Sequence, residues 1–145
     1  MYRVPVLYLI ACAAGPAQYL DDGVRLAPAA EWDVCLILTP SAASWWEPRM
    51  QELVDLTGHP VRSRYELPWE SEAVHMGTPV VAMPYFNQAQ GAQPAVAVSV
   101  ERLRKQGVVV LDGRDGYTPH PPNQGHPRAF PWERALDRVK SMINP

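Results

Sequence analysis

Four short apolar runs, separated by helical patterns, constrain the fold of this chain more than any other feature. They lie at residues 4–15, 32–40, 78–84 and 107–113. Each run is continuous rather than alternating, which is typical of strands buried on both faces of a parallel sheet. Strands that alternate with helices predict right-handed crossovers. We therefore expect residues 1–145 to form one α/β domain, a three-layer α/β/α sandwich with a parallel, Rossmann-like (flavodoxin-like) sheet.

The helices between these runs are placed by their breakers and caps. A first helix is expected near residues 17–30. A second begins with Ser41 as its cap and ends just before Gly58, because serine favours helix starts and glycine favours helix ends. A long helix is expected over residues 88–106, and a closing amphipathic helix over residues 131–143.

Residues 59–77 fit the alternating pattern less well. Residues 59–65 are a polar candidate for an edge strand, and residues 69–77 form a short helical pattern with Gly77 as its stop. A parallel sheet would normally place a further full strand and helix here. The sequence therefore predicts either a deletion or a missing segment near residues 65–70, and the poor join between the two patterns favours missing residues.

Composition narrows the class of protein. The net charge of −2 gives no electrostatic argument for a nucleic acid partner. The longest apolar run, residues 4–14, is too short to span a membrane, and only Arg3 precedes it as a basic residue, so we expect a mature cytoplasmic protein. Cys12 and Cys35 lie on apolar runs and are expected to be buried free thiols. Without a CxxC or Cys/His cluster, no metal site is expected.

A proline-rich segment follows the fourth run. Of the sixteen prolines in the chain, several crowd into "YTPHPPNQGHPRAFPW". Proline fixes φ and removes a hydrogen-bond donor, so residues 113–130 are expected to form an extended loop without a regular ladder. Such a loop is long for a compact domain, which indicates that it either covers a site or is mobile.

In an open parallel sheet, ligands bind beyond the carboxyl ends of the strands. The first two strand exits are residues 12–18, which offer small residues and backbone N–H groups, and residues 39–44, which offer the hydroxyls of Thr39, Ser41 and Ser44 at a helix start. Together they suit a phosphate, because a helix start presents free N–H groups. Two structural alternatives remain open, since Ser41 can act only as a cap and Gly15 only as a turn glycine.

The third strand exit, residues 84–90, carries an amide and two rings. Tyr85 and Phe86 can contact a planar ring, and Asn87 can orient a carboxylate. Asn87 can equally be a simple helix cap. The histidines are scattered and give no argument for a catalytic triad.

Three blocks of the sequence resemble the homo-oligomeric flavin-containing cysteine decarboxylases, the phosphopantothenoylcysteine decarboxylase-like family, and most of all its actinobacterial flavoprotein branch. The blocks are "VLYLIACAAGPA", "WDVCLILTPSAASWW" and "GTPVVAMPYFNQAQGAQPAVAVSVERLRKQGVVVLDG". The third is similar to the family's PxMNxxM block. Asn87 falls on the asparagine of that block, and Gln90 stands where the family usually has methionine. The resemblance covers about two thirds of the chain.

The resemblance implies FMN as cofactor, bound between the subunits of a homotrimer or dodecamer. In this family the flavin oxidises a cysteine thiol to a thioaldehyde before CO₂ is lost, and Asn87 would orient the carboxylate of a small-molecule or peptide substrate. The residues expected to hold the cofactor are Gly15, Pro16 and Ala17 in the first turn, Thr39, Ser41 and Ala42 in the second, and Tyr85 and Phe86 in the third.

The chain departs from the family in three ways. It lacks the Pro-Ala-Ser-Ala-Asn-Thr-like motif expected near residues 65–70, the histidine that precedes this motif, and the cysteine of the substrate-clamping loop. Enzymatic activity therefore stays an open question, and three alternatives remain. The chain can be a flavin-binding module without decarboxylase activity, a prenyl-FMN-synthase-like flavin prenyltransferase, or a structural subunit with no ligand.

Overall fold

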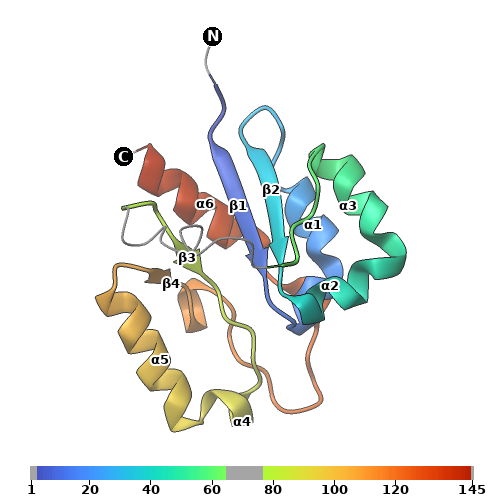
Figure 1. The fold of residues 1–145 in the computed structure, drawn as a ribbon. Helices are drawn as coiled ribbons and strands as arrows, with labels where there is room; N and C mark the ends of the chain where they lie inside the picture. The colour runs from blue at the N-terminus through green and yellow to red at the C-terminus, as the bar shows by residue number, and fades with distance from the viewer. Residues whose placement is uncertain (1–2, 65–76, 145) are drawn as a thin grey trace. The chain divides into compact units, whose positions relative to one another are not determined.

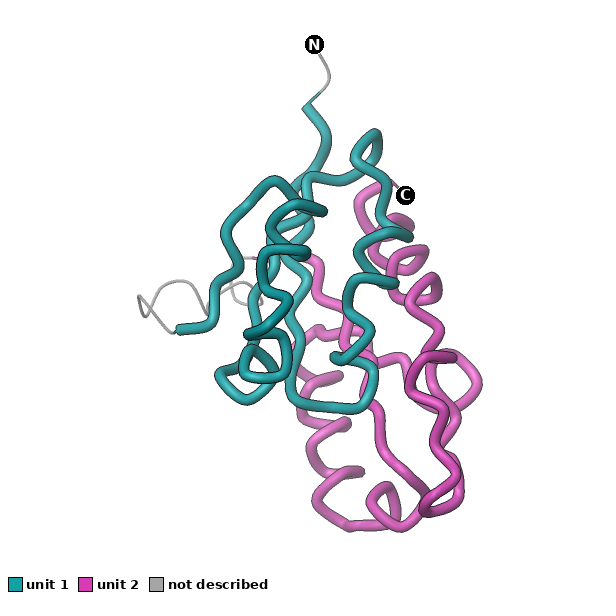
Figure 2. The backbone as a smooth tube through the Cα atoms, turned by 90° about the vertical axis from the view of Figure 1, so that its right-hand side faces the viewer, with its two compact units in different colours: residues 1–65 teal, residues 66–145 magenta. Residues whose placement is uncertain are grey.

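A computed structural model describes residues 3–64 and 77–144 (Figure 1). The chain forms two compact units, residues 1–65 and residues 66–145 (Figure 2). The segment expected to be deleted or missing, and the helix expected over residues 69–77, lie outside the described residues apart from Gly77, which has a positive φ of 75°.

Unit 1 contains a parallel pair of strands, as expected. β1 (Val6–Ala11) and β2 (Asp33–Leu38) pair in continuous register, from Val6 opposite Asp33 to Ala11 opposite Leu38. The edge strand expected over residues 59–65 is reduced, within the described residues 59–64, to one bridge, in which Arg62 pairs with Ile37 and its carbonyl accepts from Leu38 N at 2.7 Å.

The helices of unit 1 are shorter than the sequence predicted. The expectation of one helix from Ser41 to Gly58 is wrong, because Pro48 lies in a 3-10 turn that separates two helices. The cap is Thr39 rather than Ser41, since Pro40 takes the first helical position, although Gly58 does end α3, with φ 72°. The segments are η1 (Gly15–Tyr19), α1 (Leu20–Arg25), α2 (Pro40–Trp46), η2 (Glu47–Arg49) and α3 (Met50–Thr57).

The core of unit 1 lies between the helices and one face of the sheet. Its most deeply buried side chains are Leu20, Leu36, Trp46 and Leu53. The other face of β1 is open, because Val6, Tyr8 and Ile10 keep 42%, 56% and 63% of their surface exposed. The expectation that both faces of this strand are buried is therefore wrong. A continuous apolar run shows that the residues of a strand are apolar. It does not show whether other parts of the protein cover both faces of that strand.

Unit 2 contains a second, very short parallel pair, β3 (Val81–Ala82) with β4 (Val109–Val110). The expected helix over residues 88–106 is in fact two helices, α4 (Gln88–Gly91) and α5 (Pro94–Lys105). Pro94 begins α5, because proline cannot continue a helix but fits its first position. Two 3-10 turns, η4 (Gly113–Asp115) and η5 (Pro127–Ala129), and the expected closing helix, α6 (Trp132–Ile143), complete the unit; α6 packs on β3.

The chain is thus a mixed α/β protein with short parallel strands. Within the described residues these strands form two-stranded sheets, β1 with β2 and β3 with β4. The finer expectation of a three-layer, Rossmann-like sandwich stays a prediction, as does the expectation of one domain.

Proline opens five of the helical segments. Pro16, Pro40, Pro48, Pro94 and Pro127 each occupy the first or second position of a helix or 3-10 turn. The fixed φ of proline matches helical backbone, and its missing N–H costs nothing at a helix start, where that group has no partner in the helix. These five prolines therefore begin helical segments and do not interrupt them.

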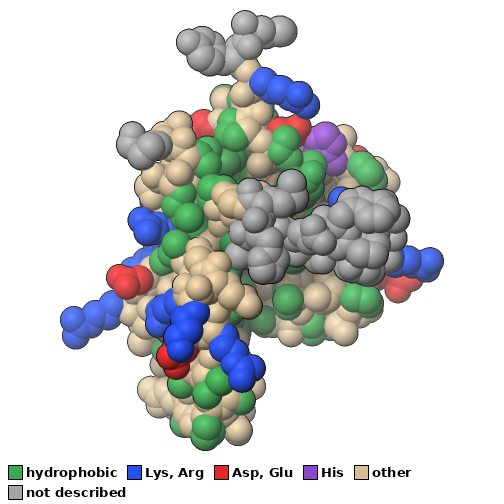
Figure 3. All heavy atoms as spheres, turned by 60° about the vertical axis from the view of Figure 1, so that its left-hand side comes forward, with side chains coloured by type: hydrophobic (Ala, Val, Ile, Leu, Met, Phe, Trp, Pro, Cys, Tyr) green, Lys and Arg blue, Asp and Glu red, His purple; other side chains and the backbone are tan. Residues whose placement is uncertain are grey.

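Charged side chains of both signs lie near one another on the surface shown in Figure 3. In unit 2, for example, Lys105 pairs with Glu101 at 2.8 Å, and Arg104 pairs with Asp112 at 2.6 Å. No helix in the described part of the chain is both long and apolar enough to cross a membrane.

Candidate functional site

The two turns predicted to bind phosphate lie side by side in unit 1. β1 and β2 are parallel and in register, so both end at the same edge, where Thr39 N donates to Ala11 O at 3.0 Å. η1 then packs against α2. The indole Nε1 of Trp46, the buried last residue of α2, donates to Ala17 O of η1 at 2.6 Å and holds η1 against the end of that helix.

The individual side chains of these turns differ in what they can offer to a ligand. Pro16, Ala17 and Ala42 are buried. Pro16 has no N–H, and the N–H groups of Ala17 and Ala42 already donate to Ala14 O at 2.8 Å and to Thr39 Oγ1 at 3.3 Å. Thr39 acts as the cap of α2, since its Oγ1 accepts from Ala42 N at 3.3 Å. Ser41 is exposed. The capacity of this edge to bind an anion therefore rests on backbone N–H groups of the turns and on the hydroxyl of Ser41.

Both cysteines of unit 1 are free thiols, as expected. Cys12 is exposed, however, because it follows the last residue of β1 at the strand exit, so its expected burial is wrong. Cys35 is half-buried in β2. Burial raises the pKa of the Cys35 thiol, and the neighbouring Asp33 carboxylate adds to the rise, while Arg62 opposes it. Cys35 is accordingly held as a neutral thiol.

In unit 2, Asn87 is a helix cap. Its Oδ1 accepts from Gln90 N at 2.8 Å, and Gln90 Oε1 accepts from Asn87 N at 3.0 Å, so the two residues form a capping box at the start of α4. The prediction that Asn87 can cap a helix is thus confirmed, and its role toward a substrate stays a prediction. The cap uses the oxygen of the amide and leaves its Nδ2 atom able to donate to a carboxylate.

The proline-rich loop lies against the Asn87 turn. Asn87 forms a parallel bridge with His120, and Gln88 N donates to His120 O at 2.8 Å. The loop itself has only isolated bridges and the two 3-10 turns, which confirms the expectation of a segment without a regular ladder. The third strand exit and the loop are therefore one continuous surface of unit 2.

Five rings gather at this surface and are called here the aromatic cluster: Tyr85, Tyr117, His120, Phe130 and Trp132. The ring centroid of Tyr85 lies 4.5 Å from the ring centroid of Tyr117 and 5.4 Å from that of His120. Of the two rings predicted to meet a ligand, only Tyr85 belongs to the cluster. The ring of Phe86 lies against Gly91 instead, where an added Cβ would be 2.6 Å from its Cε2.

Two polar features mark the cluster. The hydroxyl of Tyr117 is hydrogen-bonded with His120 Nδ1. Burial raises the pKa of Tyr117 to about 12, with a further contribution from a hydrogen bond with Tyr85, so the phenol stays neutral and can donate to that nitrogen. The Nε1 atom of Trp132 is buried and has no hydrogen-bond partner among the described residues. Such an unpaired N–H group can donate a hydrogen bond to an oxygen or nitrogen atom of a ligand.

The sequence reasoning missed Tyr117, His120, Phe130 and Trp132. The only signal was their concentration in the proline-rich segment "YTPHPPNQGHPRAFPW". Within residues 3–64 and 77–144, no three His, Cys, Asp or Glu side chains lie close enough together to hold a metal ion.

No protein-family model matches this chain, and no curated protein matches it significantly.

Proposed function

We propose that this chain is an FMN-binding flavoprotein whose phosphate site is formed by the two strand-exit turns of unit 1. The observation that carries the proposal is the shared carboxyl edge of β1 and β2, where Thr39 N donates to Ala11 O at 3.0 Å and the two strand-exit turns begin side by side. Nucleotide-binding α/β proteins bind phosphate with backbone N–H groups at this edge of their sheets. The resemblance of both turns to flavin-containing decarboxylases supports the same assignment.

The substrate side of the proposal rests on unit 2. Asn87 Nδ2 is assigned to a carboxylate of a small-molecule or peptide substrate, and the aromatic cluster offers flat apolar surface to the rest of that substrate. Bound FMN would supply the redox chemistry for an oxidative decarboxylation or a related step. The chain's own residues bind and orient, and the phenol of Tyr117, whose pKa burial raises, stays neutral beside His120. A homotrimer or dodecamer, implied by the resemblance, is part of the proposal.

The phosphate site is tested by comparing FMN with riboflavin, which has the same ring and no phosphate. Ser41→Asp adds a negative charge to an exposed position of the second turn and disturbs no buried side chain. We expect it to weaken FMN binding by at least about tenfold and riboflavin binding much less. Ser99→Asp, the same change at an exposed position of α5, is the matched control for charge. Equal affinity for FMN and riboflavin in the natural chain would contradict the proposal.

The role of Asn87 is tested by Asn87→Asp. Aspartate caps helices as well as asparagine does, so α4 should keep its start. The variant loses the Nδ2 donor and places a negative charge beside the substrate carboxylate. Substrate-dependent flavin reduction should therefore fall strongly while the circular dichroism spectrum stays unchanged. Unchanged turnover would mean that Asn87 is only a cap.

A flavin-binding module without chemistry is the second candidate, and the capping box favours it, because the cap accounts for Asn87 without any substrate. The two candidates differ in one measurement. A module would bind FMN and leave the flavin oxidised with every carboxylate substrate offered.

A further inference from the structure

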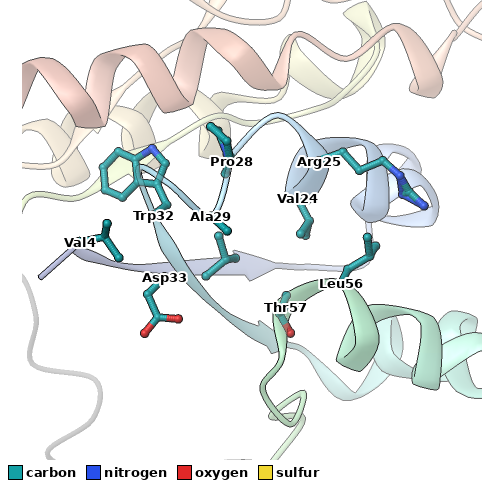
Figure 4. Close-up of a pocket in the computed structure, with 11 residues that line it drawn as sticks. Val4, Val24, Arg25, Pro28, Ala29, Trp32, Asp33, Leu56 and Thr57 are labelled. Carbon is teal, nitrogen blue, oxygen red and sulfur yellow. The ribbon is translucent and has the colours of Figure 1, made fainter.

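The cavity of unit 1 lies far from the strand-exit turns. Its volume is about 280 Å³, and it is lined by Val4, just before β1, and by Trp32, just before β2 (Figure 4). The strand-exit turns follow the opposite, carboxyl ends of the same strands. Six residues of strand span about 20 Å, so the five-carbon chain of FMN is too short to join a phosphate at the turns to a ring in this cavity. The ring of such a ligand needs another surface.

Trp45 offers an aromatic surface near the second turn. It lies on α2, which begins at that turn, and 45% of its side chain surface is exposed. Within residues 3–64 and 77–144, its indole takes part in no hydrogen bond and no ring contact. An indole in this state leaves much apolar surface in water, and tryptophan is enriched where proteins bind their partners.

The neighbouring Trp46 already anchors α2, so Trp45 is not needed for that purpose. Trp46 is 1% exposed, and its Nε1 donates to Ala17 O at 2.6 Å. The guanidinium of Arg49 lies 4.9 Å from the centre of the same ring. Adjacent residues of a helix point about 100° apart, so the burial of Trp46 turns Trp45 outward. The packing of unit 1 therefore gives no reason for an indole at position 45.

Ser41 and Trp45 share one face of α2. Both are exposed, and side chains four residues apart on a helix are neighbours, with about 5–6 Å between their Cβ atoms. Helical side chains also lean towards the amino end of their helix, so the indole of Trp45 leans over the turn that carries Ser41. An aromatic surface thus lies beside the exposed hydroxyl of the second strand-exit turn.

We propose that Trp45 binds the flavin ring of FMN by stacking, an assignment that rests on the proposed phosphate site. The five-carbon chain of the ligand would follow the surface of α2 from Ser41 to the indole. Stacked aromatic rings attract each other in offset arrangements, and an indole exposed on one side can accept a flat ring without moving its neighbours. The phosphate is contacted by the turns and the ring by Trp45, so the two contacts can be separated by experiment.

The first test measures the affinities of FMN and riboflavin for Trp45→Ala by calorimetry. Both ligands carry the ring, so both should bind about tenfold more weakly, and the ratio of the two affinities should stay as in the natural chain. Ser41→Asp is expected to change that ratio instead. Leu56→Ala, which removes an exposed apolar side chain from α3 of the same unit, is the control and should leave both affinities unchanged.

The second test uses flavin fluorescence, which an indole quenches on contact by donating an electron to the excited ring. Trp45→Phe keeps an aromatic surface and removes the indole. FMN bound to this variant should therefore emit several-fold more strongly than FMN bound to the natural chain, at similar affinity. A purely structural role for Trp45 would not change the emission.

The outcomes separate this proposal from the proposed function. If the natural chain binds FMN more tightly than riboflavin, but Trp45→Ala binds both as well as before, the phosphate site stands and the role of Trp45 is overturned. If Trp45→Ala loses FMN only because its subunits separate, as sedimentation would show, Trp45 is a subunit contact and the ring assignment is also overturned. A natural chain that binds no flavin overturns both proposals.

Discussion

Unit 1 and unit 2 bury their apolar side chains in different ways. Unit 1 packs helices onto one face of β1 and β2 and contains most of the fully buried side chains, Trp46 and Leu53 among them. In unit 2, the long helices α5 and α6 contain no buried side chain, and among the described residues the buried apolar side chains are Val110 on β4, Val108 and Leu111 on either side of it, and Phe130. A layered core thus supports unit 1, whereas unit 2 depends on a cluster of rings set by a loop. Substitutions in the two units should accordingly act through different contacts.

The largest effect is expected in the core of unit 1. Leu53 is 0% exposed, whereas Leu103 on α5 of unit 2 is 37% exposed. Leu53→Ala should reduce the free energy of unfolding by about 2–5 kcal/mol, because it removes buried contacts and leaves a cavity. Leu103→Ala, which makes the same chemical change, should cost less than about 1 kcal/mol. Urea unfolding followed by circular dichroism measures both. Equal losses would show that α5 is covered in solution, and the contrast between the units would fail.

An intermediate effect is expected at Gly116, which supports the start of the proline-rich loop. A Cβ there would lie 1.9 Å from the carbonyl oxygen of Leu111, so Gly116→Ala must move backbone. We expect a loss of about 1–3 kcal/mol and a disturbed aromatic cluster. Near-ultraviolet circular dichroism reports the cluster directly. An unchanged aromatic signal would mean that the loop does not determine how the rings are arranged.

The smallest effect concerns pH and Tyr117. The pKa of this phenol is about 12 in the folded chain against an ordinary value of 10.0, so folding favours its neutral form. Below pH 10 this contribution to stability is fully present, and it is lost as pH rises towards 12, because the unfolded chain releases the proton first. Tyr117→Phe should remove that part of the alkaline destabilisation. The test measures the urea midpoint of unfolding of the natural chain and of Tyr117→Phe below and above pH 10. If both midpoints fall equally with pH, the raised pKa of Tyr117 is contradicted.

Parts of this fold follow from local sequence. The apolar runs identified β1 and β2 as a parallel pair, and Gly58 marked the end of α3. The breaks at Pro48 and Pro94 were also legible, since proline favours helix starts, but the apolar pattern continued across both and suggested longer helices. Local chemistry therefore predicts where elements occur better than where they are interrupted.

The aromatic cluster could not be predicted in the same way. Tyr85 and Tyr117 are brought together by the path of the loop, which no short-range pattern determines. The exposed face of β1 could not be predicted either. Val6, Tyr8 and Ile10 are apolar and look like core residues in the sequence, whether or not other residues cover them. The two strand-exit turns lie beside each other because parallel strands share a carboxyl edge, which the sequence indicated. That this edge binds phosphate, and that the ligand there is FMN, stay predictions.

The prolines that open five helical segments also act on the unfolded chain. A residue with fixed φ has fewer conformations to lose on folding, so each such proline at a compatible site stabilises the native chain by about 0.4–1 kcal/mol without any contact in it. Part of the stability of this protein therefore resides in the restricted entropy of its denatured ensemble. Replacing Pro40 or Pro94 by alanine would remove that share while leaving the helix that follows in place.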